Sequence, residues 1–169
     1  MNETVYYKSP VGVLEIGAVD DALAKVHFLN TERSVQTDES SLDYKRPKST
    51  VLKQVVKQLN GYFSGKLFEF NLPLNQEGTA FQQKVWNELP KIAFGHTCSY
   101  HSLSKKLGDV KAIRAVGTAN GRNNIAIIVP CHRVIGKDGS LVGYGGDLWR
   151  KKWLLAHEAK FAHGVQTLF

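Results

Sequence analysis

Short apolar runs separated by turn residues predict a β-meander at the start of the chain. Strands are expected near residues 6–7, 11–17 and 23–28, with turns at 10–12 and 20–21. Because successive side chains of a strand point to opposite faces, this alternation gives the sheet one buried face.

A helix and a linker are expected to complete this first lobe. Residues 31–49 are largely polar and predict a surface loop, whereas apolar side chains recur at helical spacing from 50 to 63. Residues 68–72 alternate and predict a further strand. The polar segment 73–78 indicates a linker, so the expected lobes are 1–76 and 79–169.

Two short helices joined by a tight turn are predicted in the second lobe. Ser99 is the expected N-cap of a helix that Gly108 ends, and Asp109 caps a second helix from Val110 to Asn120, which Gly121 ends. This pairing is typical of a helix-turn-helix, although many helical hairpins bind no nucleic acid. An earlier helix begins with a capping box of Thr79 and Gln82, ends at Pro90 and carries the apolar stripe Phe81, Val85, Trp86 and Leu89.

The last part of the chain combines a buried segment, a glycine-rich loop and a helix. Residues 125–129 are all apolar and predict a buried strand or extended segment. Five glycines between residues 136 and 146 predict a loop with an exposed wing, and Asp147 is the expected cap of a helix to about residue 160. The expected fold is therefore an α/β N-terminal lobe, a small β-sheet with a helix, followed by a mainly α, winged-helix-like C-terminal lobe that contains the helix-turn-helix.

Composition restricts the class of protein. The chain has 169 residues, of which 43% are hydrophobic and 22% charged, as in ordinary globular proteins. It lacks an apolar run of the length of a membrane span, and residues 1–9 carry no apolar signal segment. Its two cysteines cannot form a disulfide framework. We therefore expect a protein of the reducing cytoplasm with free thiols and no membrane partner.

The positive charge is confined to the second half of the chain. The net charge is +7, yet residues 1–80 hold nine basic and ten acidic side chains, whereas residues 81–169 hold thirteen and five. A basic half of this kind fits either a solvated surface or a polyanionic partner.

Small side chains line one face of the second predicted helix. Ala112, Ala115 and Ala119 recur along it, with Gly117 between them. Such a face fits close helix packing as well as close approach to a nucleic-acid backbone. Arg114, always charged and in the middle of the helix, favours the second interpretation.

Cys131 is the candidate nucleophile. It follows the buried segment directly after Pro130, which ends regular strand pairing, and His132 stands beside it. A thiol of ordinary pKa is a weak nucleophile until a base removes its proton, and an acid commonly orients that base. By composition alone, an inert buried cysteine is the favoured interpretation. The spacing does not choose among the acids of the basic half, which are Glu88, Asp109, Asp138, Asp147 and Glu158.

Several segments together resemble the O6-alkylguanine-DNA alkyltransferases. Residues 128–136, Ile-Val-Pro-Cys-His-Arg-Val-Ile-Gly, are similar to the active-site signature of that family. The other similar segments run in family order, whereas the first 75 residues match only loosely. They are Gly95–Tyr100, Ala112–Gly117, Asn120–Asn123, Gly143–Gly146 and Trp153–Glu158.

The resemblance implies a role for each matching residue. Cys131 is the implied alkyl acceptor, and His132 the base that takes its proton through a water molecule. Glu158 is the implied acid that orients His132. Tyr100 is implied to protonate guanine N3, and Asn123 to hold the turn and the active-site segment together.

The resemblance also implies the partner and the reaction. The partner is double-stranded DNA containing O6-alkylguanine, and O4-alkylthymine is a further expected substrate. The flipped-out base gives its alkyl group to Cys131 once, irreversibly, without cofactor or metal. We expect a monomer in solution, with cooperative binding on DNA as an alternative. The implied DNA-binding residues are Tyr100, Arg114, Ala112, Ala115 and Gly117, and the implied pocket residues are Val134, Tyr144 and Gly145.

The sequence departs from the family pattern at two points and fits two rival functions. Gly145 replaces the serine or similar residue of many relatives, which predicts a more mobile loop but leaves the needed amide. No cysteine precedes residue 98, so the N-terminal zinc site of some relatives is not expected. A DNA lesion-binding module without chemistry and a cysteine hydrolase using Cys131 and His132 are the rivals. Adjacent Cys and His side chains rarely form the direct hydrogen bond that a hydrolase needs.

Overall fold

The computed structural model describes residues 2–164 and divides into two compact units. One unit runs up to Glu77 and includes residues 124–126, and the other comprises Gly78 to Asn123 and the chain from Ile127 onward. Residues 124–126 belong to the first unit although they come from the second half of the sequence, and this was not predicted. None of the helices within residues 2–164 is long and apolar enough to cross a membrane.

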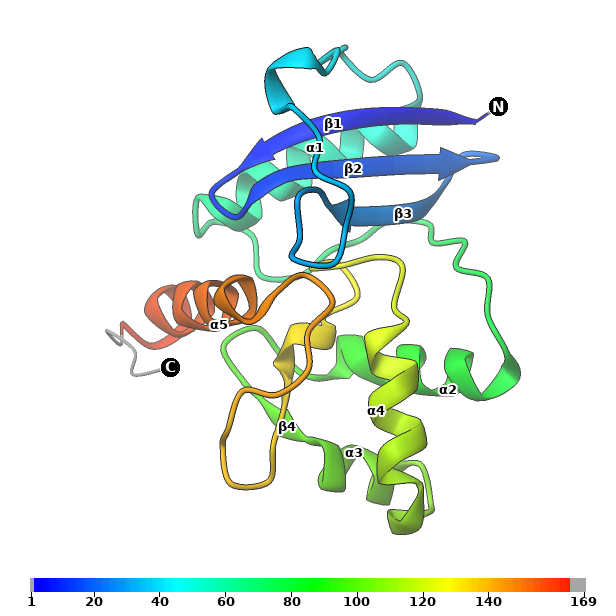
Figure 1. Ribbon diagram of the computed structural model, residues 1–169, viewed down its shortest axis with the longest axis vertical. Helices are drawn as coiled ribbons and strands as arrows, with labels where there is room; N and C mark the ends of the chain where they lie inside the picture. The colour runs from blue at the N-terminus through cyan, green and yellow to red at the C-terminus, as the bar shows by residue number, and fades with distance from the viewer. Residues whose placement is uncertain (1, 165–169) are drawn as a thin grey trace. The chain divides into compact units, whose positions relative to one another are not determined.

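The N-terminal unit is built on the predicted meander. Strands β1 (Glu3–Ser9), β2 (Gly12–Val19) and β3 (Ala22–Phe28) are antiparallel in the order β1-β2-β3. Helix α1 (Thr50–Phe63) lies against one face of the sheet (Figure 1) and contacts all three strands. That face holds much of the core: Val5, Leu14, Ile16, Val26, Val55 and Leu59 are each at most 2% exposed. The prediction of a single buried face is wrong for β2, because its successive residues Val13 and Leu14 are both buried.

The strand predicted at residues 68–72 is wrong. This segment has no ladder partner, because the side chain of Gln58 in α1 binds both backbone groups of Asn71, accepting from its N–H at 2.9 Å and donating to its carbonyl at 3.0 Å. Pairing with the sheet is limited to one parallel bridge between Leu23 and Leu74. The helix therefore satisfies backbone groups that a strand would otherwise have to satisfy.

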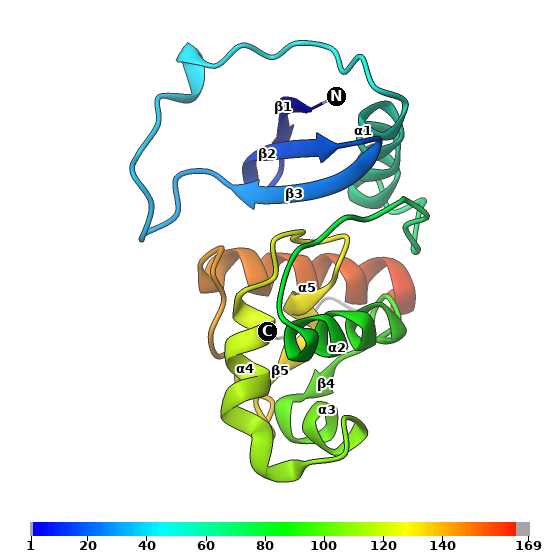
Figure 2. The same ribbon diagram turned by 90° about the vertical axis from the view of Figure 1, so that its right-hand side faces the viewer.

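Within the described residues, the C-terminal unit places four α-helices around one short strand pair (Figure 2). Strands β4 (Cys98–Ser99) and β5 (Val134–Ile135) are parallel. The helices are α2 (Ala80–Glu88), α3 (Tyr100–Lys106), α4 (Ile113–Gly121) and α5 (Leu148–His163). Short 3-10 helices are η2 (Leu89–Lys91), η3 (Val110–Ala112) and η4 (Cys131–Arg133). Another 3-10 helix, η1 (Glu39–Ser41), lies in the N-terminal unit. A small antiparallel sheet followed by a helical unit is the predicted fold class.

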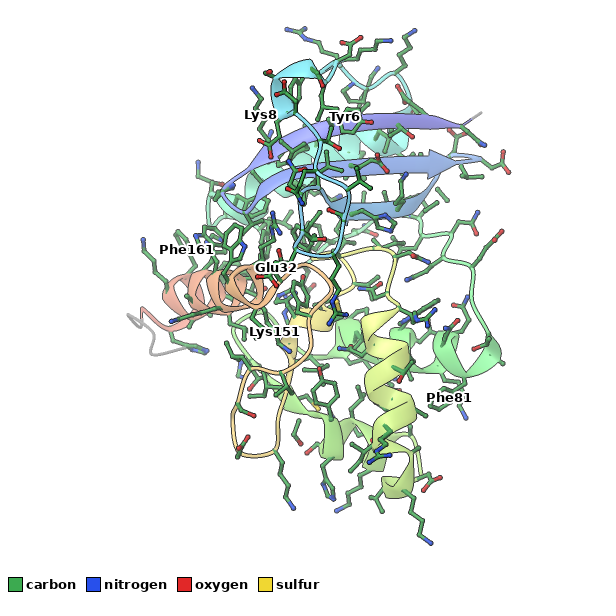
Figure 3. The ribbon with its side chains drawn as sticks, viewed as in Figure 1. Tyr6, Lys8, Glu32, Phe81, Lys151 and Phe161 are labelled. Atoms are coloured by element: carbon green, nitrogen blue, oxygen red, sulfur yellow. The ribbon has the colours of Figure 1, made fainter. Side chains whose placement is uncertain are left out.

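The capping signals of the second half are largely confirmed. Thr79 and Gln82 form the capping box of α2, and Ser99 caps α3. Gly108, at φ 91°, closes α3, and the side chain of Asp109 accepts from the Lys111 N–H. This α3–α4 arrangement is consistent with a helix-turn-helix. The predicted stripe of α2 is buried except at Phe81, which points outward (Figure 3) and is 37% exposed.

Residues 125–129 are buried as predicted but do not form a strand. Only Ile125 pairs, in a single parallel bridge to Val26, and the chain then turns. Ile127 has a φ of 70°, which a β-branched residue rarely adopts, and is fully buried. The turn aims the following Pro130 and Cys131 into the C-terminal unit.

The predicted capping role of Asp147 is wrong. Asp147 does occupy the N-cap position of α5, but with a φ of 70° its side chain makes no capping hydrogen bond. The carboxylate instead accepts from the buried Arg150 guanidinium at 3.1 Å. Residues 136–146 form the predicted loop, without a helix or strand.

Candidate functional site

Cys131 lies in the interior of the C-terminal unit. It begins η4, its backbone N–H donates to the Val129 carbonyl at 2.8 Å, and only 7% of the residue is exposed. Burial raises the pKa of its thiol, while a hydrogen bond from Asn123 and the charge of Lys151 work to lower it. The thiol therefore needs a base to become a nucleophile.

His132, the residue after Cys131, forms a fully buried pair with Glu158. His132 Nε2 lies 2.6 Å from Glu158 Oε2. Burial lowers the pKa of His132, against the opposing effect of Glu158, so the imidazole is neutral at rest. Because an ionised carboxylate can only accept, Nε2 carries the proton and Nδ1 keeps its lone pair. Nδ1 is buried and accepts no hydrogen bond within residues 2–164, which leaves it free to act as a base.

Arg133 completes this cluster and was missed in the sequence analysis. Its Nε donates to Glu158 Oε1 at 2.7 Å and its Nη1 to the Ile92 carbonyl at 2.6 Å. Burial works to raise the pKa of Glu158, but the charges and hydrogen bonds of His132 and Arg133 hold it well below its ordinary value. The signal available in the sequence was a second basic residue directly after the Cys-His pair.

Lys151 is a second residue that sequence reasoning missed. Its ammonium is fully buried and donates to the carbonyls of Val134 at 2.6 Å and Val142 at 2.9 Å, so it ties the loop to β5. Burial lowers its pKa to about 8. Periodicity places this lysine on the helix but does not reveal that it is buried.

Tyr100 borders the same site from the first turn of α3. Its hydroxyl donates to the Val142 carbonyl at 3.3 Å, and burial raises its pKa. On α4, a Cβ added at Gly117 would come no closer than 3.9 Å to the Tyr100 ring. The glycine leaves room beside the ring.

Two amides at the end of α4 hold the turn that carries Cys131. Asn123 Nδ2 donates to the Val129 carbonyl at 2.8 Å, and Asn120 Nδ2 donates to the Cys131 carbonyl at 3.2 Å. Asn120 was quoted in the sequence analysis only as part of a motif. Both contacts satisfy backbone acceptors that have no strand partner.

The predicted pocket residues surround the same turn and loop. Val134 is fully buried, and burial raises the pKa of Tyr144 well above its ordinary value. Gly145 lies in the loop, where an added Cβ would reach nothing closer than the Gly121 carbonyl at 3.9 Å. A side chain would therefore fit at Gly145.

The small-residue face of α4 is only partly open. Arg114 and Ala115 are exposed and Ala112 and Gly117 are half-buried, so all four border the surface. Ala119 is buried, and its carbonyl accepts from the Trp86 indole at 2.8 Å. Ala119 therefore contributes to the packing of α4 against α2. The described residues contain no group of three or more His, Cys, Asp or Glu side chains that could hold a metal ion.

Both halves of the chain match known family profiles. Residues 4–76 match the family profile described as 6-O-methylguanine DNA methyltransferase, ribonuclease-like domain, and residues 80–160 match the profile of its DNA binding domain. A methylated-DNA–protein-cysteine methyltransferase of Mycobacterium tuberculosis is 45% identical over 95% of this chain and 94% of its own. The constitutive enzyme of that name from Bacillus subtilis is 42% identical over 86% and 88%.

A solved structure extends this likeness to the fold. The crystal structure of Mycobacterium tuberculosis OGT in complex with DNA superposes with a TM-score of 0.81 at 41% identity, covering 94% of this chain and 93% of that chain.

Glu158→Gln should lower the free energy of unfolding by an amount that depends on pH. The pKa of Glu158 is lower in the folded chain than its ordinary 4.5, so the ion pair stabilises the fold above that pH and is lost as the pH falls through and below it. In urea unfolding, the variant should lose about 3–5 kcal/mol at pH 7, and the gap to wild type should narrow by pH 3. Glu88→Gln, which breaks the exposed pair with Lys91, should cost less than about 1 kcal/mol. A constant gap between pH 7 and pH 3 would contradict the assigned ionisation.

Proposed function

The chain belongs to the 6-O-methylguanine DNA methyltransferase family and repairs DNA by transferring an alkyl group to one of its own cysteines, and we propose that Cys131 is that cysteine. The observation that carries the proposal is the neutral, buried His132 directly after it, with Nε2 held by Glu158. The other thiol, of Cys98, is half-buried in β4 and donates to the Ser99 carbonyl at 3.5 Å.

The proposed reaction exchanges the thiol hydrogen for the alkyl group. His132 Nδ1 takes the thiol proton through a water molecule, and the thiolate sulfur attacks the alkyl carbon as its bond to O6 breaks. Tyr100 gives its phenolic proton to guanine N3, so the purine leaves as a neutral base. The imidazolium proton then restores the phenol through solvent. The products are guanine and a thioether, whose stability makes the transfer irreversible.

The proposed substrate is an alkylated base flipped out of the DNA duplex. O6 of guanine lies on the major-groove edge of a stacked base, so it reaches a buried thiol of a protein that docks in the minor groove only after the nucleotide is extruded. The backbone groups of Cys131, Val134 and Gly145 are proposed to bind the purine edges, and Tyr144 to line the pocket. O4-alkylthymine presents a similar alkyl carbon and is a second proposed substrate.

The open part of α4 is the proposed DNA surface. Ala112, Ala115 and Gly117 allow the helix to approach the floor of the minor groove, which is only about 6 Å wide. Arg114, exposed in the same helix, is proposed to fill the gap left by the flipped nucleotide. Lysines and arginines of the basic half neutralise phosphates, so binding should weaken with salt.

The remaining assignments follow from this chemistry. We propose that residues 79–169 form the DNA-binding and acceptor domain and 1–76 a separate α/β domain. The protein acts as a monomer without cofactor or metal. A reagent that must stay a free thiol requires a reducing compartment, which supports a cytoplasmic location.

Intact-mass analysis tests the acceptor. After incubation with duplex DNA containing O6-methylguanine, each chain should gain a single methyl group, and peptide mapping should place it on Cys131. Cys131→Ser should gain none, because it lacks the thiol, and Cys98→Ser should react like wild type. A methyl group on Cys98, or repeated turnover by one chain, would rule out the proposal.

Arg114→Ala should slow repair of duplex DNA selectively. Extrusion costs a few kcal/mol, part of which the arginine offsets, so single-turnover methylation from a duplex should fall by about tenfold or more. Reaction with a single-stranded oligonucleotide, whose base is already unpaired, should change by less than about twofold. The nearby Lys111→Ala is the control and should weaken duplex binding without this selectivity. Equal losses on both substrates would exclude a role in flipping.

A further inference from the structure

Gly95 lies with its backbone directly against α5. It precedes β4 and has a φ of 81°, in the left-handed region that favours glycine. A Cβ added there would lie 2.4 Å from the Cβ of Ala162 and 3.1 Å from Nε2 of His163. Because non-bonded carbon atoms do not approach so closely, any side chain at this position would push the backbone away from the helix.

Side chains of α5 bind both backbone groups of Gly95. Its N–H donates to Glu158 Oε1 at 3.3 Å, and its carbonyl lies 2.9 Å from His163 Nε2. A carbonyl can only accept, so this Nε2 carries a proton. The His163 ring also meets the His96 ring edge-on, with the centroids 5.4 Å apart. Two contacts with one helix therefore hold the N–H on the buried carboxylate.

This N–H matters because Glu158 orients the proposed base. Glu158 Oε2 lies 2.6 Å from His132 Nε2, and Oε1 accepts from Arg133 Nε at 2.7 Å. The N–H of Gly95 is a further donor to Oε1, from a backbone group that does not titrate. Donors on Oε1 turn the carboxylate so that Oε2 meets the imidazole, and they favour its charged form. Tyr144 of the loop lies within range of the same charge.

We propose that Gly95 is a positioning residue of the alkyl transfer: its N–H holds the Glu158 carboxylate in the orientation that keeps His132 a base, and only glycine lets the N–H reach it. This inference rests on the proposed function of Cys131. Without the N–H the charged carboxylate is less stabilised, so its pKa and that of the imidazole bound to it rise. The proposed acid Tyr100 should stay in place, because β4 pairs with β5 between it and Gly95.

The pH profile of methylation tests the proposal. Single-turnover rates of Cys131 methylation are measured at saturating protein with a duplex that carries O6-methylguanine. In Gly95→Ala the plateau rate should fall by about tenfold or more, because the imidazole is misplaced. The acid limb of the profile should move up by about 0.5–1 pH unit, whereas the alkaline limb should not move. The double variant Gly95→Ala/Ala162→Gly removes the nearest obstacle and should recover most of both.

Gly108→Ala is the matched control for backbone strain. Gly108 also has a positive φ, of 91°, but a Cβ added there would meet no atom of the described residues within 4 Å. The variant therefore carries the same kind of strain without displacing the backbone. It should keep the wild-type acid limb.

A second variant decides the question if circular dichroism shows that Gly95→Ala is poorly folded. His163→Ala removes an exposed side chain and the contact with the Gly95 carbonyl, so the acid limb should move in the same direction by a smaller amount. His163→Gln, which keeps a donor, should restore it.

The contrary outcomes separate this inference from the proposed function. An unmoved acid limb in folded Gly95→Ala, or in His163→Ala where that variant is used instead, makes the contact purely structural even if the rate falls. This result overturns the inference while sparing the proposed function. No methylation of Cys131 in the wild type overturns both.

Discussion

One buried carboxylate fixes the arrangement of the C-terminal unit. Glu158 lies in α5, yet its oxygens accept from His132 and Arg133 of η4 and from the Gly95 backbone N–H at 3.3 Å. Burying this charge without such partners would cost several kcal/mol, so α5 is stable only where η4 presents both side chains. The same contacts bring Cys131 into the interior. Stability and reactivity thus depend on a single cluster.

Side chains take the place of a strand ladder around this cluster. The turn that precedes η4 leaves backbone carbonyls without strand partners, and buried carbonyls need donors. Amides at the end of α4 supply two of them, and Lys151 of α5 holds the loop to β5. The groups proposed to act on substrate are therefore positioned by several helices at once.

Elements governed by local patterns could be predicted from the sequence. The meander, α1 and the capping box depend on residues a few positions apart. The error at residues 68–72 arose where a distant side chain intervened, as Gln58 does at Asn71. The error at Asp147 is local, because Arg150, three residues further along the helix, takes the carboxylate that was expected to cap it. For the site, Cys131 and His132 were found as neighbours, whereas Glu158 came only from the family resemblance. Burial and pairing across the fold are not visible in a sequence, which is why three residues were missed as members of the site: Arg133, Lys151 and Asn120.

The protonation state of His132 tests the central claim most directly. The account requires a neutral imidazole with its proton on Nε2, bonded to Glu158, and a free lone pair on Nδ1. Long-range 1H–15N spectra of the 15N-labelled protein distinguish the two tautomers and the imidazolium. At pH 7 the account predicts a protonated Nε2 and an unprotonated Nδ1. A doubly protonated ring, or a proton on Nδ1, would contradict the assignment of His132 as the base for Cys131.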